Sequence, residues 1–239
     1  MSNLIDTNFD FYSDTPSGKD PDALSPTLRR YHKLLWSKPL PNGLEFNLTD
    51  TTTGVYLYHK SKLGEFFLSS DCLCHTYSRQ KGMAHIVNQI PSSEIDTFFR
   101  ICSTIGGYII FPSNRIDNKM TINMSRGVNH KIKDRFDLTL ECIRRHYSNQ
   151  DSPLSDTLEI YSDFFDLFKD FQGYVNFFLL QDLVNDDYSS INYYIPFVSF
   201  NNPALPVDVQ QYRLYKKNMT ALVVARNKRI LNVINGNSS

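Results

Sequence analysis

The chain has no apolar segment long enough to cross a membrane. A transmembrane helix needs about 20 consecutive apolar residues, and the richest stretch, residues 174–184, is interrupted by Asn176, Gln181 and Asp182. The N-terminus is acidic and lacks the apolar run of a secretory leader. The four cysteines are therefore expected to be reduced thiols. Together these absences predict a soluble, cytoplasmic protein that does not insert into a membrane.

Net charge is also absent, because 25 basic side chains balance 25 acidic ones. The molecule as a whole is therefore not a polycation that seeks DNA or an anionic membrane. The charges are nevertheless segregated: residues 151–187 are mostly acidic and residues 207–233 are mostly basic. Such blocks are usually solvated faces, or faces that contact each other within the fold.

The motifs of well-known enzyme classes are missing. There is no Gly-x-Ser-x-Gly nucleophile elbow, and Gly106-Gly107 lacks the following Lys-Ser/Thr of a phosphate-binding loop. Residues 72–75, Cys-Leu-Cys-His, space their thiols too closely for a structural zinc site, whose paired ligands are normally two to four residues apart. We therefore expect no metal, and the sequence assigns no cofactor.

Aromatic residues are abundant, with 17 Phe and 14 Tyr against 1 Trp. This composition favours an aromatic-rich core, with tyrosine hydroxyls near water, over a base-stacking surface. At 239 residues with 41% hydrophobic side chains, the chain is long enough to bury such a core.

Local signals predict an α+β fold, a helix-rich single domain with a small mixed or antiparallel sheet. Ser25-Pro26 pairs a good N-cap with proline at the first helical position, so a helix should run from there to about Trp36. Further helices are expected over residues 78–90, 92–105, 129–147, 154–168, 173–184 and 207–233. Extended segments are expected over residues 44–48, 54–59, 65–68 and 191–197, with a hairpin joining 108–111 to 119–124.

The predicted domain spans residues 25–234. Residues 1–24 carry five Asp and scattered Phe, which is typical of a flexible acidic leader whose Phe9 or Phe11 attaches to the body. Residues 235–239 are expected to form a disordered tail.

Cationic and amide side chains are concentrated between residues 111 and 147. If Arg126-Gly127 lies where a strand gives way to a helix, the amide groups and the helix dipole there favour an anion. Arginine presents a fixed fork of donors that suits phosphate or carboxylate. The predicted ligand-binding cleft is formed by Arg115, Asn123, Arg126, His130 and Arg135. The competing interpretation is a structural ion-pair network that includes Asp134 and Glu141.

The leading hypothesis is a binding protein for a phosphate-bearing ligand, either a nucleotide or RNA. One alternative is an enzyme of nuclease or transferase type acting on a nucleotide or nucleic acid, with His130 as the best candidate for acid/base catalysis. Another is a protein-interaction module in bacterial–phage conflict. Whether the chain is an enzyme, and whether it pairs with a partner or with itself, stays open.

Several strings resemble a family of uncharacterised bacterial proteins, a domain of unknown function. They are SPTLRRYHKLLWSKPLPNG (residues 25–43), YLYHKSKLGEFFLSSD (56–71), KIKDRFDLTLECIRRHY (131–147), GYVNFFLLQDLV (173–184) and ARNKRI (225–230). The resemblance implies one conserved domain without a membrane span and brings no activity and no catalytic residue. Residues 58–61 and 67–71 also faintly resemble strands of ADP-ribosyltransferases, although an ordinary hairpin with polar outward residues explains them more simply.

Overall fold

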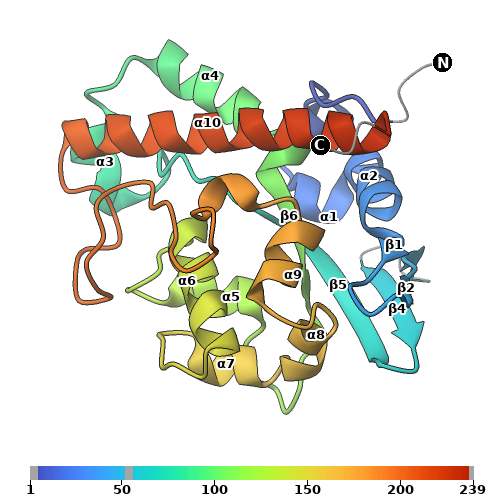
Figure 1. Cartoon of the computed structure of the whole chain (residues 1–239). Helices are drawn as coiled ribbons and strands as arrows, with labels where there is room; N and C mark the ends of the chain where they lie inside the picture. The colour runs from blue at the N-terminus through green and yellow to red at the C-terminus, as the bar shows by residue number, and fades with distance from the viewer. Residues whose placement is uncertain (1–4, 52–55, 237–239) are drawn as a thin grey trace.

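An antiparallel sheet and a long helix form the framework of the fold (Figure 1). The computed structural model describes residues 5–51 and 56–236. Its larger sheet has the strand order β3 (Thr49–Asp50), β4 (Leu57–Ser61), β5 (Gly64–Cys72), β6 (Tyr108–Pro112), and a smaller one pairs β1 (Lys38–Pro39) with β2 (Glu45–Phe46). Every pairing between these strands is antiparallel, so the predicted α+β fold with a small sheet is confirmed.

Helices surround the sheet, and short 3-10 helices (η) join several of them. In chain order they are η1 (Phe11–Asp14), α1 (Pro21–Leu24), α2 (Pro26–Trp36), η2 (Lys81–Met83), α3 (Ala84–Val87), α4 (Ser92–Cys102), η3 (Ile105–Gly107), α5 (Ile122–Val128), α6 (Phe136–Tyr147), α7 (Ser155–Glu159), α8 (Ser162–Asp166), α9 (Phe171–Phe177), η4 (Gln181–Leu183) and α10 (Val209–Ile234). Among the described helices, none is both long enough and apolar enough to span a membrane.

The N-cap that the sequence predicts at Ser25 is confirmed. Ser25 caps α2 by accepting a hydrogen bond from the Leu28 amide at 3.0 Å. Asp208 caps α10 in the same manner, accepting from the Gln211 amide at 2.7 Å. The aromatic core is confirmed as well, because Trp36 and rings such as Phe46, Phe111 and Phe136 are wholly buried.

Backbone turns shorten several predicted helices. Lys133 and Asp134 adopt left-handed conformations, with φ of 49° and 60°, so α6 starts at Phe136 instead of residue 129. Leu179, with φ of 56°, lies between α9 and η4, and α7 and α8 are separate short helices. Residues 78–90 contain only η2 and α3. Hydrophobic spacing marked the buried positions here but could not show these left-handed turns.

The predicted strand over residues 119–124 is wrong. Asp117 and Asn118 do form a left-handed turn, with φ of 51° and 57°. Thr121 then caps α5 by accepting from the Met124 amide at 3.4 Å, so the chain continues as a helix. Residues 191–197 form no strand either, apart from one isolated bridge between Ile191 and Val184. A threonine N-cap was the signal that the hairpin assignment overlooked.

The N-terminal segment folds onto the body instead of forming a free leader. Ile5 and Phe11 are buried, and the Phe11 ring packs edge-on against Tyr31 and Tyr108. Its aspartates cap helices: Asp10 caps η1 and Asp20 caps α1. The acidic composition therefore reflects capping. Predictions for residues 1–4, 54–55 and 237–239 lie outside the described residues.

Candidate functional site

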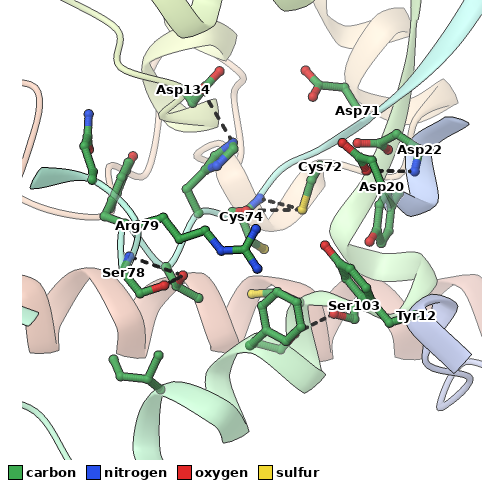
Figure 2. Close-up of a pocket in the computed structure, with 18 of the residues that line it drawn as sticks. Tyr12, Asp20, Asp22, Asp71, Cys72, Cys74, Ser78, Arg79, Ser103 and Asp134 are labelled. Atoms are coloured by element: carbon green, nitrogen blue, oxygen red, sulfur yellow. Dashed lines mark hydrogen bonds and ion pairs between the residues drawn. The ribbon is translucent and has the colours of Figure 1, made fainter. Parts of the chain in front are cut away.

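A pocket of about 710 Å³ opens where the N-terminal segment meets the end of β5 and the long β5–β6 connection (Figure 2). Antiparallel pairing between β5 and β6 aligns Asp71 with Ile109 and Cys72 with Tyr108. The chain between β5 and β6 runs through η2, α3, α4 and η3, and this connection encloses the pocket. A cavity of this size suits a small organic ligand.

Carboxylates from four separate segments line the pocket, one of them Asp96 of α4. Asp20 and Asp22 come from the start of α1, Asp71 from β5, and Asp134 from the left-handed turn before α6. The amide of Asp22 donates to Asp20 Oδ1 at 3.0 Å, so the capping turn itself orients the first of these groups. Figure 2 shows Asp20, Asp22 and Asp71 grouped on one side of the pocket.

Asp71 forms an ion pair with the guanidinium of Arg126. Arg126 is fully buried behind it, where Nε also donates to Thr139 Oγ1 at 2.9 Å and Nη2 to the Asp134 carbonyl at 3.1 Å. Burial raises the pKa of Asp71 to about 6, although Arg126 opposes the shift and Asp134 adds to it. The carboxyl of Asp71 is thus ionised at neutral pH and changes charge just below it.

Asp22 has a different environment. Burial raises its pKa well above the ordinary value, and the nearby charge of Asp71 raises it further. The nearby Ser70 side chain opposes the shift. Asp22 Oδ1 is buried without a hydrogen-bond partner. Burial of this kind favours the protonated, neutral form of a carboxyl.

His75 lines the pocket beside Asp134, with 3.9 Å between Nε2 and Oδ2. Burial lowers the pKa of His75, while Asp134 partly offsets that effect. Its Nε2 atom and Gln80 Oε1, on the same wall, have no hydrogen-bond partner. Because buried polar atoms are normally hydrogen-bonded, unpartnered atoms along one pocket wall point to a bound molecule.

Cationic and aromatic groups complete the lining. Lys133 and Arg79 contribute positive charge, and Figure 2 shows the Arg79 side chain extending toward the middle of the pocket from the side opposite Asp20 and Asp22. Tyr12 and Phe99 contribute a ring pair with centroids 4.8 Å apart. The pocket therefore offers acceptors, a cation and an apolar ring surface to one ligand.

Three free thiols, those of Cys72, Cys74 and Cys102, also line the pocket. Cys72 Sγ donates to the Cys74 carbonyl at 3.2 Å. The hydrogen bond with Cys74 raises the pKa of Cys72, and burial raises the pKa of Cys74 and of Cys102. Thiols with raised pKa values are poor nucleophiles. Within the part of the chain that the structure describes, no group of three or more His, Cys, Asp and Glu residues is arranged to hold a metal ion.

Of the residues predicted to bind a ligand, Arg126 alone is joined to this pocket, through Asp71. Arg135 is buried against Asp137, with Nε–Oδ1 at 3.1 Å, and also donates to the Ala204 carbonyl at 2.8 Å. Asn123 donates to Ser69 Oγ and to the Ser70 carbonyl, both at 3.2 Å. The structure does not gather the predicted residues into one cleft, and ligand binding by them stays a prediction.

His130 and Arg115 lie at the surface. Both side chains are exposed, and Arg115 Nη2 contacts Met124 Sδ at 3.4 Å. The sequence analysis missed Tyr12, Asp20 and Asp22, because it treated their segment as a leader. One signal was present: Asp20-Pro21 is a cap followed by proline at the first helical position, the same pattern as Ser25-Pro26.

The fold and the pocket together define an α+β domain with a carboxylate-rich pocket. The chain belongs to a family of unknown function, DUF6994, whose model matches residues 5–230. This confirms the resemblance to an uncharacterised domain, while a bacterial origin stays a prediction. No curated protein and no solved structure matches the chain.

Proposed function

We propose that the chain binds a phosphate-bearing ligand with a hydroxylated ring, such as a nucleotide or a sugar phosphate, in this pocket. The observation that carries the proposal is a set of buried atoms of the pocket lining that have no hydrogen-bond partner: Asp22 Oδ1, His75 Nε2 and Gln80 Oε1. An empty hydrogen-bonding position in a buried site costs about 1–3 kcal/mol, so a ligand that fills several such positions gains binding energy from them.

The carboxylate side of the pocket suits hydroxyl groups. Ionised carboxylates only accept hydrogen bonds, whereas a protonated carboxyl also offers one donor, the form that burial favours for Asp22 by raising its pKa. Ring hydroxyls both donate and accept, so they satisfy Asp20, Asp22 and Gln80 together. The Tyr12–Phe99 pair adds an apolar surface against which a sugar or base ring can pack.

The opposite side suits a phosphate. Arg79 and Lys133 supply the positive charge, and guanidinium groups match phosphate oxygens in geometry. The count of aspartates overstates the repulsion that an anion would meet. The charge of Asp71 is balanced by Arg126, and burial favours the neutral form of Asp22 by raising its pKa. The phosphate site is therefore proposed beside Arg79, and not in the Arg126–Arg135 region that the sequence analysis predicted.

A mononucleotide is favoured over RNA because many cations of α10 have partners inside the fold. Arg226 is buried against the carbonyls of Phe178, Gly106 and Tyr108. Lys216 pairs with Glu94, and Arg229 pairs with Asp182. With three of its six cations engaged in this way, the helix offers fewer cations to a nucleic-acid backbone.

The test is direct binding measured by calorimetry with a panel of nucleotides, sugar phosphates and their dephosphorylated forms. Arg79→Ala should weaken binding of the phosphorylated ligand by about tenfold or more, since a hydrogen bond to a charged group contributes about 1.5–3 kcal/mol. It should leave the dephosphorylated ligand unaffected. Arg100→Ala, an exposed arginine on α4 outside the pocket, is the matched control. Equal binding by the Arg79 and Arg100 variants would contradict the proposal.

Native mass spectrometry of freshly purified protein, with its absorbance ratio at 260 and 280 nm, gives an independent reading. A co-purified nucleotide would identify the ligand class at once. The absence of binding to every panel member, combined with a clean mass, would overturn the proposal.

A further inference from the structure

One stretch of consecutive residues, 74–80, forms a continuous part of the pocket lining. Two buried tyrosines of α10 hold its backbone. The Tyr215 hydroxyl donates to the His75 carbonyl at 2.9 Å and accepts from the His75 amide at 3.2 Å. The Tyr212 hydroxyl donates to the Thr76 carbonyl at 2.6 Å. The position of this segment is therefore set by the long C-terminal helix.

The turn formed by Lys133 and Asp134 also lines the pocket, and it is joined to the first segment. The Tyr77 hydroxyl donates to the Lys133 carbonyl at 3.0 Å. On the other side of the turn, Arg126 Nη2 donates to the Asp134 carbonyl at 3.1 Å, and the Asp134 amide donates to the Arg126 carbonyl at 3.2 Å. Residues 74–80 and 133–134 thus form one connected wall whose backbone is held from behind.

The backbone of this wall is strained at three positions. Tyr77, Lys133 and Asp134 adopt the left-handed conformation, with φ of 55°, 49° and 60°. Residues with a Cβ atom pay a steric cost in that conformation, so it persists only where the surrounding structure requires it. Such strain is concentrated at sites where a side chain must be held ready for a ligand. The side chains that this wall holds are those of His75 and Asp134.

His75 and Asp134 lie close together without a hydrogen bond. Nε2 of the histidine is 3.9 Å from Oδ2 of the aspartate, the contact marked by the dashed line from Asp134 in Figure 2. Nε2 is buried and has no hydrogen-bond partner, whereas the His75 side chain as a whole is 34% exposed. The ring also stacks on Tyr77, with centroids 5.9 Å apart. The imidazole is therefore fixed beside a carboxylate while its other atoms remain open to the pocket.

The cations proposed to hold the phosphate belong to the same wall. Arg79 is four positions after His75 in the lining segment, and Lys133 directly precedes Asp134. Figure 2 shows Arg79 and Asp134 on the same side of the view, away from Asp20. A phosphate bound by these cations lies on the part of the pocket that His75 lines.

The charge of His75 is balanced between opposing neighbours. Burial lowers its pKa, Asp134 and Asp20 raise it, and Arg126 lowers it. The hydroxyls packed against its segment stay uncharged at neutral pH, because burial raises the pKa of Tyr77 and of Tyr215. The ring is therefore mostly neutral at pH 7 before a ligand enters. A further negative charge nearby favours the protonated form.

We propose that His75 takes up a proton from solvent when the ligand's phosphate binds, so that an imidazolium forms between the phosphate and Asp134. This inference rests on the proposed function, because it assumes a phosphate on this wall. One proton moves from solvent to the ring, and no covalent bond changes. The new cation separates two anions that would otherwise repel each other. It forms only when the anion is present, so His75 favours phosphorylated ligands over their dephosphorylated forms.

The uptake of a proton makes binding depend on pH. The pKa of His75 is higher in the complex than in the free protein, so binding is tighter at low pH and weakens as pH rises through the interval between the two values. One proton taken up lowers the association constant by at most about tenfold for each unit of pH. The phosphate monoester itself has a second pKa of about 6. Its titration is the same for every variant and cancels when variants are compared.

The experiment is calorimetry with each nucleoside monophosphate and sugar phosphate of the panel, from pH 6 to 8, in two buffers of different ionisation enthalpy. The buffer dependence of the heat gives the number of protons taken up. Wild type should take up as much as one proton more than His75→Asn, which keeps a polar side chain that does not titrate. His75→Asn should also bind about tenfold more weakly at pH 6.5, because it lacks the charged contact. His85→Asn, an exposed histidine on α3, is the control.

Two further measurements separate the proton from a structural effect. The NMR titration of the His75 ring should move to higher pH when the ligand is added. Asp134→Asn should reduce the proton uptake, because it removes the carboxylate that supports the imidazolium. Asparagine tolerates the left-handed conformation of this position, and the backbone bonds to Arg126 do not depend on the side chain, so this variant should melt like wild type.

The outcomes distinguish this inference from the proposed function. Binding with equal proton uptake by wild type and His75→Asn would overturn the role of His75 and leave phosphate binding intact. The absence of binding by every panel member would overturn both. Uptake that is undiminished in Asp134→Asn would refute the pairing with Asp134.

Discussion

Replacing Arg126 by alanine should destabilise the fold severely, and the structure sets the scale. The guanidinium is fully buried between the rings of Phe111 and Phe136, with its Cζ 5.8 Å and 5.7 Å from their centroids. Breaking a buried ion pair by removing one partner costs about 3–5 kcal/mol. Because a domain is stable by only about 5–15 kcal/mol, Arg126→Ala should lose a large share of that total.

The assay is urea unfolding followed by the fluorescence of Trp36, the single tryptophan, which is wholly buried. Arg115→Ala is the control, because that arginine is exposed and contacts only the Met124 sulfur among the described residues. The deficit of Arg126→Ala should be about 4 kcal/mol at pH 7. It should shrink at pH 5, where Asp71, whose pKa is already raised to about 6, takes up a proton and no longer leaves a buried charge.

Two results would refute this reasoning. A deficit at pH 7 as small as that of Arg115→Ala would show that the buried pair contributes little to stability. An equal deficit at pH 5 and pH 7 would show that lost packing, and not the uncompensated charge of Asp71, causes the destabilisation.

Three further predictions follow from buried groups. The His32 ring should not titrate between pH 5 and 8 by NMR, because its pKa is lowered from 6.5 to about 3. Since the pKa in the folded state lies below the pKa in the unfolded state, the contribution of His32 to stability is present above pH 6.5 and is lost on acidification. Asp71 acts in the opposite direction: its pKa is raised from 3.8 to about 6, so its contribution to stability is present below 3.8 and is lost as pH rises through 6. The loss of unfolding free energy is at most about 3 kcal/mol. Asp71→Asn should abolish this pH dependence of stability, measured by urea unfolding at pH values from below 3.8 to above 6. Gly106→Ala should lower stability by about 2 kcal/mol or more, because the new Cβ would lie 2.5 Å from the Val223 carbonyl oxygen. Gly82→Ala is the control: the position has open space around it, so this variant should melt like wild type.

Sequence reasoning succeeded where a local rule decides the structure. The cap of α2 depends on the Ser25 side chain and the amide groups beside it, and it was predicted. The left-handed residues Lys133, Asp134 and Leu179 were missed, because ordinary side chains adopt that conformation only when the surrounding structure requires it.

The site was less accessible to sequence reasoning than the fold. Arg126 and Arg135 were recognised as notable, yet a charged side chain looks the same in a sequence whether it faces a ligand or an internal carboxylate. Their partners Asp71 and Asp137 lie 55 and 2 positions away, and the sequence holds no rule that selects the first pairing. The pocket combines residues from η1, β5 and α4, segments that are brought together only by the folded chain.

The long helix α10 has a consequence for biosynthesis. Its Arg226 binds carbonyls 48 to 120 positions earlier, Asn227 receives the Gly106 amide at 2.7 Å, and Tyr215 accepts from the His75 amide at 3.2 Å. These bonds close the loops that form the far side of the pocket. While a ribosome has synthesised β6 but not residues 209–234, the nascent chain lacks these hydrogen bonds to the pocket loops. Folding of the binding site should wait for the last helix to emerge from the exit tunnel, and until then the nascent chain should be a substrate for chaperones.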